Sequence, residues 1–542
     1  MAVPPVQPTR AVATGPTGLV RTLGVSLMLD VVLGLLIAVA LPLAILAIPN
    51  TISVVAALLP PDVSQIEMIR AHGMALPAMV LTVPLAAMAL RRVRAAPILV
   101  AGLALLAFAD AAGGYAASTT VVGALRVLHG IGAGLLVSAT LVAVWERSRL
   151  LRAVWGGALA VSLLTAQALA LWPLDEVDSW KVTLQPYPIL TGVALVLAAL
   201  YLVLWRRSGE GVVIGFGRTV SRRGRLLTEA LPAVGIAALA VGSTFDWSPG
   251  LVVLAASLSI LALLGLASAG VVDGVTGRAP ACTMLAVGVV ILPTAAQVTY
   301  IELGGLGGPG LSGLWPAFTI AGVAGLLAAV LVNRLGDGAM PVVTAGGLVV
   351  VVAGLCAVRL LLPASGGLML ILPFVLLAVG ASVALTGALR PAGGGAALFA
   401  LSLFFPAVLG GFLLGSGIQV ARLKEATTPQ ALVDGFVGAL HLWALVGGGL
   451  VVAVIALGAA LVRLSSAAAA DMTAASATTG AAREGSPSWP EVGLEREWRP
   501  EPGPRPGPGP GPGPEKTTAP PVVVPPPAPS PEDDPGNGPV HP

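Results

Sequence analysis

Titratable residues inside or at the ends of long apolar stretches include Asp30, Asp110, Arg126, His129 and Glu302. Placing a charge in hydrocarbon costs about 2.5 kcal/mol or more, so each of these groups needs a charged partner or a water-filled cavity. Side chains that gain and lose a proton in such a place can link proton movement to a change of conformation. These five residues are therefore our candidates for proton coupling.

Asp110 and Arg126 are expected to face each other on neighbouring helices. With a rise of about 1.5 Å per residue, they lie about 20 Å and about 22 Å from the same side of a core about 30 Å thick. The sequence therefore predicts an Asp110–Arg126 ion pair, with His129 one helical turn deeper. Two alternatives stay open: an inert clamp between the helices, and a neutral, hydrogen-bonded His129 in place of a proton carrier.

Asp30 lies six residues into the first apolar stretch, about 9 Å from its start. No cation is predicted at its depth, so desolvation should favour its protonated form and allow proton exchange. The alternative is a hydrogen-bonded carboxylate at the helix end. Glu302, at the end of a later stretch, is predicted to be interfacial, with a membrane-buried position as the alternative.

A substrate cavity would need polar or aromatic side chains within the apolar stretches. Gln167, Gln297, Tyr300 and Trp315 are the candidates for such a lining. Aromatic residues near the ends of membrane spans also mark the interface with water, so this second interpretation stays open for Tyr300 and Trp315.

Enzymatic and metal chemistry find little support in the motifs. The chain has no H-E-x-x-H and no G-x-x-x-x-G-K-[ST] pattern. The GLSG at 310–313 resembles a protease nucleophile motif but has no matching histidine motif. Cys282 and Cys356 both fall inside predicted spans, which excludes a disulfide framework and a cysteine metal site. We therefore expect no enzyme, no cofactor and no metal, and the dispersed basic residues argue against a nucleic-acid partner.

The elements that position these residues follow from composition: 56% of the 542 residues are apolar, 10% are charged, and the mean hydropathy is +0.93. Apolar runs of about 20 residues cross a bilayer as helices. The chain is therefore predicted to be an all-α polytopic membrane protein with fourteen transmembrane helices, at 24–48, 72–90, 97–116, 121–144, 152–172, 187–205, 226–243, 249–271, 279–301, 310–332, 341–362, 367–389, 394–420 and 437–462.

Loop charge predicts the orientation of these spans. Most loop Lys and Arg residues fall on the side of the N-terminus, whereas the other side holds only Arg70, Lys181, Arg422 and Lys424. The positive-inside rule then places both termini in the cytoplasm. The expected location is the plasma membrane. The Pro/Gly-rich segment after about Ser465 is predicted to be a disordered cytoplasmic tail, either without a partner or bound by a proline-reading protein.

Two short connections repeat one pattern, in PLAAMALRRVRAAPILVAGL and in LLAAVLVNRLGDGAMPVVTAGGL. The pattern resembles the loop signature G-x-x-x-D-R-x-G-R of the major facilitator superfamily. It maps onto Arg91 and Arg92 in the first copy, where Arg91 stands in place of the acid, and onto Asn333, Arg334 and Gly336 in the second. LRVLHGIGAG, which contains Arg126 and His129, resembles a further motif of this superfamily, and fourteen spans resemble its drug:proton antiporter branch.

The resemblance implies two six-helix bundles with a substrate site between them, and alternating access. The expected organisation is an N-terminal tail (1–23), a first bundle (24–205), a linker (206–225), two additional helices (226–271), a second bundle (279–463) and the tail (464–542). The expected function is proton-coupled export of an amphipathic small molecule, with the bilayer, the substrate and protons as partners. An uncoupled facilitator, a lipid translocator or a non-transporting scaffold on the same fold is the alternative, motivated by the missing acid at Arg91.

Overall fold

A computed structural model describes residues 16–174, 177–208, 222–245, 247–270, 275–303, 310–364, 366–424 and 426–484. Every regular element in these ranges is a helix, which confirms the predicted all-α class. Residues 1–15 of the predicted N-terminal tail, most of the linker, and the tail beyond residue 484 lie outside the described residues, whereas residues 16–23 already belong to a helix. Residues 1–474 form one compact unit, and residues 475–542 form a second.

The first part of the chain contains α1 (Pro16–Leu46), α2 (Gln65–His72), α3 (Ala75–Leu90), α4 (Ala95–Gly113), α5 (Thr119–Trp145), α6 (Arg149–Leu171) and α7 (Pro188–Ser208). Short 3-10 turns lie at η1 (Ala56–Leu58), η2 (Trp172–Leu174) and η3 (Trp180–Leu184). Within this group α5 packs against α1, α3 and α4, while α7 packs against α1 and α4.

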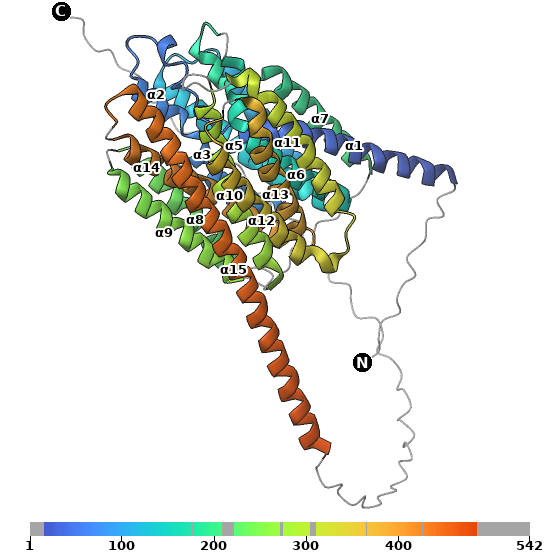
Figure 1. The fold of residues 1–542 in the computed structure, drawn as a ribbon. Coiled ribbons are helices and arrows are strands. Elements are labelled where there is room, and N and C mark those ends of the chain that lie inside the picture. The colour runs from blue at the N-terminus through green and yellow to red at the C-terminus, as the bar shows by residue number, and fades with distance from the viewer. Residues whose placement is uncertain are drawn as a thin grey trace, which may run out of the picture. The chain divides into compact units, whose positions relative to one another are not determined.

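The remaining helices are α8 (Arg222–Gly242), α9 (Pro249–Ser268), α10 (Val275–Ile301), α11 (Gly310–Val332), α12 (Met340–Leu361), α13 (Ile371–Leu389), α14 (Gly394–Leu423) and α15 (Pro429–Glu484), with 3-10 turns η4 (Asp337–Ala339) and η5 (Gly367–Leu370). In Figure 1, α8 and α9 lie beside α14, and α8 also packs against α3. The two groups of helices meet where α6 contacts α10, α11 and α13, and where α3 contacts α14.

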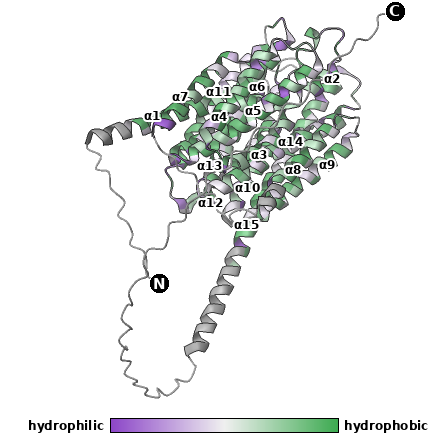
Figure 2. Cartoon of the chain, turned by 180° about the vertical axis from the view of Figure 1, so that it is seen from behind, coloured by the Kyte–Doolittle hydropathy of each residue, from purple (hydrophilic) through white to green (hydrophobic). Residues whose placement is uncertain are grey.

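Thirteen helices in the described ranges are long and apolar enough to span a bilayer, against the fourteen predicted. The remaining helix, α8, contains the shorter apolar segment Thr228–Gly242. Glu229 within this segment is fully buried and pairs with Arg91 at 2.5 Å. Figure 2 shows hydrophobic residues along most of the helices and hydrophilic residues mainly at helix ends. This distribution is expected for helices that cross a bilayer, because charges in hydrocarbon are costly.

The last helix continues well beyond its predicted end at residue 462. It extends to Glu484 through a segment rich in Ala, with only one Gly and no Pro. Alanine has the highest intrinsic helix propensity, which explains why this polar stretch continues as helix before the Pro-rich region begins.

Glycines bring several helix backbones close together. At the crossing of α4 and α5, a Cβ atom on Gly132 would lie 2.8 Å from the carbonyl oxygen of Gly102, and one on Gly102 would lie 3.0 Å from that of Gly132. Helix association in lipid depends on this kind of close packing between small residues. The two helices that carry Asp110 and His129 are therefore held at a fixed distance from each other.

Candidate functional site

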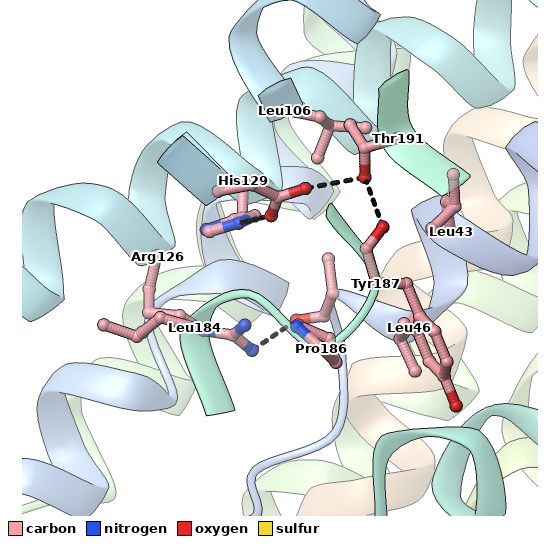
Figure 3. A pocket seen from close by; sticks show the side chains of 11 residues that line it. Leu43, Leu46, Leu106, Arg126, His129, Leu184, Pro186, Tyr187 and Thr191 are labelled. Atoms are coloured by element: carbon pink, nitrogen blue, oxygen red, sulfur yellow. Dashed lines mark hydrogen bonds and ion pairs between the residues drawn. The ribbon is translucent and has the colours of Figure 1, made fainter. Parts of the chain in front are cut away.

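Asp110 of α4, His129 of α5 and Thr191 of α7 form one hydrogen-bonded cluster (Figure 3). Nε2 of His129 lies 2.8 Å from Oδ1 of Asp110, and the Thr191 hydroxyl donates to Oδ2 of Asp110 at 2.6 Å. Nδ1 of His129 lies 2.9 Å from the carbonyl oxygen of Leu125, one turn earlier on α5. All three side chains are buried, so each polar atom depends on these partners.

A small cavity adjoins the cluster, between α1, α4, α5 and the segment that leads into α7. Its lining residues are Leu43, Leu46, Ala47, Leu106, Asp110, Arg126, His129, Leu184, Pro186, Tyr187 and Thr191. The centre of a water molecule can reach about 30 Å³ of this space. That volume admits one or two waters and is too small for an amphipathic substrate.

The predicted ion pair between Asp110 and Arg126 is wrong, because each of the two side chains has other hydrogen-bond partners. Arg126 donates to backbone carbonyl oxygens: Ala47 at 2.5 Å, His72 at 3.0 Å and Pro49 at 3.3 Å. These carbonyls stand at the ends of α1 and α2, where helical partners are missing, so they attract a buried guanidinium. Asp110 still attracts Arg126 electrostatically, but the histidine takes its hydrogen bond.

Asp30 also has a cation partner that the sequence did not predict. Its Oδ1 accepts from Nε of Arg147 at 2.5 Å, and Nη2 of the same arginine donates to the carbonyl and hydroxyl oxygens of Ser26. Arg147 lies two residues beyond the end of α5, and Asp30 lies near the middle of α1. The prediction that no cation lies at the depth of Asp30 is therefore wrong.

Glu146, the C-cap of α5, lies beside this pair and was not among the predicted candidates. Burial raises the pKa of its carboxyl to about 7, against the lowering effects of Arg94 and Arg147. Arg94 itself stacks over the ring of Trp205 at 5.1 Å. This end of the first group of helices therefore contains an acid that titrates near neutral pH.

We expect Glu146→Gln to stabilise the protein relative to wild type by an amount that grows as pH rises from about 4.5 to about 7 and is constant above. Between these values the folded protein binds more protons than the unfolded chain, so the contribution of Glu146 to stability falls with rising pH. Unfolding temperatures of both proteins across this range would show it. Glu67→Gln, at an exposed carboxylate of α2, is the control, and an equal shift in both variants would contradict the assignment.

Glu302 follows the last residue of α10 and is fully buried in protein, not exposed at an interface. Its Oε1 accepts a hydrogen bond from the backbone N–H of Ala364 at 2.9 Å, and burial raises the pKa of the carboxyl. This hydrogen bond joins the connection after α12 to the end of α10. Its hydrogen-bond partner Ala364 belongs to the second group of helices, and Glu302 does not line the cavity beside Asp110.

The four predicted cavity residues lie on α6, α10 and α11, and none of them lines the cavity beside Asp110. Gln167 is buried on α6, and Gln297 of α10 packs against α14 at Gly415. Tyr300 is 41% exposed, and its ring centroid lies 5.7 Å from that of Phe436. Of the four, Trp315 makes an aromatic contact with the first group of helices, through Trp172.

The residues of the repeated loop motif occupy two helix connections. Arg91 pairs with Glu229 of α8, while Arg92 is exposed. In the second copy, Asn333, Arg334 and Gly336 form the turn between α11 and α12. Asp337 follows this turn and receives two cations, Arg390 at 2.9 Å and Arg149 at 3.6 Å.

Sequence reasoning missed Asp337, Arg149 and Arg390. A signal was nevertheless present, because the second motif copy has Asn333 where the family pattern has its acid, and an aspartate stands four residues later. Arg390 also donates to the carbonyl oxygens of Val332 and Asn333. Arg149 starts α6, so this ion cluster links the first group of helices to the second.

Comparisons with known proteins give distant likenesses to solved structures alone. No protein-family model matches the chain, and no curated protein matches it. Among solved structures, the proton:xylose symporter XylE of the major facilitator superfamily, bound to 6-bromo-6-deoxy-D-glucose, is 13% identical with a TM-score of 0.48, over 78% of this chain and 95% of that chain. The human organic anion transporter MFSD10 is 16% identical with a TM-score of 0.47, over 79% and 99%. At these scores neither likeness assigns the chain to a family.

Proposed function

We propose that this integral membrane protein is a secondary transporter of the major facilitator type, which exports an amphipathic small molecule by alternating access and is coupled to protons. The observation that carries the proposal is the contact between α6 and α11. These two helices, one from each group, run antiparallel, and residues that close the contact by different chemistry stand at its opposite ends. Alternating access requires two such closures that can open in turn.

At one end of this contact, Arg149, Asp337 and Arg390 form what we term the ionic gate. The side chains of Arg149 and Asp337 are 65% and 60% exposed. Exposed ion pairs contribute about 0 to 1 kcal/mol each, because water and salt screen them. A closure of this strength can open and close without a large energetic cost.

At the other end, Trp172 and Trp315 form what we term the aromatic gate. Their ring centroids lie 5.0 Å apart with a nearly perpendicular arrangement. Within the second group, Trp315 contacts the ring of Phe318, and Phe318 stacks on Phe374 with ring centroids 4.7 Å apart. Between the gates, Gly157 lies against Ala329 and Gly322 against Val161, so the middle of the contact consists of small and apolar residues.

The second candidate is an uncoupled facilitator, lipid translocator or scaffold on the same fold. Two observations favour it: Asp30 is neutralised by Arg147, and Arg91 at the acid position of the motif pairs with Glu229. Under this alternative, flux would occur without any dependence on a proton gradient.

Reconstitution in liposomes separates the two candidates. With ethidium as an amphipathic probe, we expect wild-type efflux to follow an imposed pH gradient, and Asp337→Asn to reduce it about threefold or more, because the variant weakens both ion pairs of the ionic gate. Asp337→Glu should restore most of the flux. Asp62→Asn, at an exposed aspartate in the connection before α2, is the matched control. Flux that ignores the gradient would favour the facilitator, and no flux above empty liposomes would favour the scaffold.

A further inference from the structure

We propose that Asp110 and His129 together bind a single coupling proton, and that its release breaks one of the two hydrogen bonds of the His129 ring. This inference rests on the proposed function and names the site of its proton. The argument depends only on which atoms can donate and which can accept.

The carbonyl oxygen of Leu125 determines the state of the histidine ring. A carbonyl oxygen can only accept, so Nδ1 at 2.9 Å from it must carry the hydrogen and donate. This leaves Nε2 to face Oδ1 of Asp110 at 2.8 Å. A second hydrogen must lie between these two atoms, because a bare Nε2 and a carboxylate oxygen would repel each other.

The position of this second hydrogen does not alter the proton count. It belongs either to an imidazolium that faces a carboxylate or to a carboxylic acid that faces a neutral imidazole. Thr191 donates to Oδ2, which leaves Oδ1 as the oxygen that meets the ring. Since the two groups share the hydrogen, the pair should lose it in one step that belongs to neither residue alone.

Loss of this proton is incompatible with the observed geometry in either tautomer. If Nδ1 keeps its hydrogen, the lone pair of Nε2 faces the Asp110 carboxylate. If Nε2 keeps a hydrogen instead, the lone pair of Nδ1 faces the Leu125 carbonyl. One bond therefore breaks whichever tautomer remains, and a buried polar group left without its partner costs about 1 to 3 kcal/mol.

Charged and titratable groups surround the pair on several elements. Arg126 on α5 is a permanent cation that attracts the Asp110 charge, so it favours proton release. His72 of α2 lies against Arg126, Tyr187 lies just before α7, and Lys181 of η3 donates to the carbonyl of Gly114 after α4. The lining that α1 contributes, Leu43, Leu46 and Ala47, adds no titratable group. The cavity beside the pair has room for the one or two waters that a proton relay requires.

The broken bond should be transmitted through α7 and α1, and not through α4 and α5. The close approach at Gly102 and Gly132 holds the backbones of α4 and α5 together, so a side chain or a neighbouring helix must respond. The Thr191 hydroxyl attaches α7 to Asp110 directly. α7 packs against α1, and α1 packs against α6, which begins with Arg149 and is followed directly by Trp172.

Nitrogen-15 NMR of ring-labelled histidine in the full-length protein tests the proton site without any substrate. Measured over a range of pH that spans the release of the proton, the His129 signals, assigned with His129→Gln, should show a protonated Nδ1 and one transition that is shared with Asp110. In Asp110→Asn the side-chain amide can donate to Nε2, so the neutral ring should be retained and the transition lost. Asp30→Asn should leave it unchanged. A neutral His129 that carries its hydrogen on Nε2 across this range would overturn the proposal.

Flux measurements distinguish failure of this inference from failure of the proposed function. If the pair carries the coupling proton, Asp110→Asn should reduce pH-driven ethidium flux about tenfold or more. Asp110→Glu, which keeps a titratable oxygen, should recover part of it. Undiminished pH-driven flux in Asp110→Asn would overturn this inference but would still support the proposed transporter function. A normal His129 transition without any flux in wild type would support the proton site but would contradict the proposed function.

Discussion

Gly130→Ala should prevent most of the protein from reaching its folded state. Gly130 lies where α5 crosses α3, and a Cβ atom there would overlap the carbonyl oxygen of Ala75 and lie 2.8 Å from the Cβ of Ala78. Neither atom belongs to a flexible side chain that could turn away, so the two helix backbones must separate. Overpacking of this kind costs about 1 to 3 kcal/mol or more. The yield of monodisperse protein after detergent extraction, and its unfolding temperature, would measure the effect.

Gly235→Ala on α8 is the matched control for this substitution. Nothing lies within 4 Å of a Cβ atom built at that position. Alanine is favoured over glycine in a helix by about 1 kcal/mol, so the control should be neutral or slightly stabilising. If both variants behaved alike, the close approach of α3 and α5 would not be a determinant of folding.

Hydropathy and loop charge were sufficient to predict the helices, because a bilayer imposes a minimum apolar length on every span. The predicted span at 226–243 corresponds to α8. A window average over this segment cannot detect that its acid, Glu229, has a partner in a distant loop, Arg91.

The candidate site was predicted in its location but not in its bonding. Depth along the helices placed Asp110 near Arg126 and His129, and all three line one cavity. The depth of a residue along its helix does not reveal that Arg126 donates to backbone carbonyls. It also does not reveal that Thr191 on α7 donates to Asp110, which is the partner of His129 as well.

Asp30 illustrates a different limit of the sequence. Its partner Arg147 is 117 positions away and belongs to the end of α5, beyond the apolar segment. Only the packing of α1 against α5 brings the two groups together. The sequence pattern predicted which groups lie in the membrane region, whereas ion pairs between helices required the three-dimensional arrangement.

Arg126→Leu should destabilise the protein by about 3 to 5 kcal/mol, the cost of breaking a buried charged network on one side. The guanidinium is 3% exposed and donates to the carbonyls of Ala47, Pro49 and His72, which would all lose a donor. Arg126→Lys should recover only part of the loss, because one ammonium cannot reproduce the planar fork. Denaturant or thermal unfolding in detergent would give the difference. Arg359→Leu, at an exposed arginine with a single carbonyl contact at 3.2 Å, is the matched control.

Removing the positive charge of Arg126 should also change how tightly Asp110 and His129 hold their shared proton. Without a positive charge nearby, the Asp110 carboxylate is less favoured, so the shared proton is held more tightly. We expect the His129 transition in Arg126→Lys to stay close to that of wild type, and in any folded fraction of Arg126→Leu to move to higher pH. A transition at unchanged pH in Arg126→Leu would mean that Arg126 only binds carbonyls. An unchanged stability would mean that the ends of α1 and α2 do not need it.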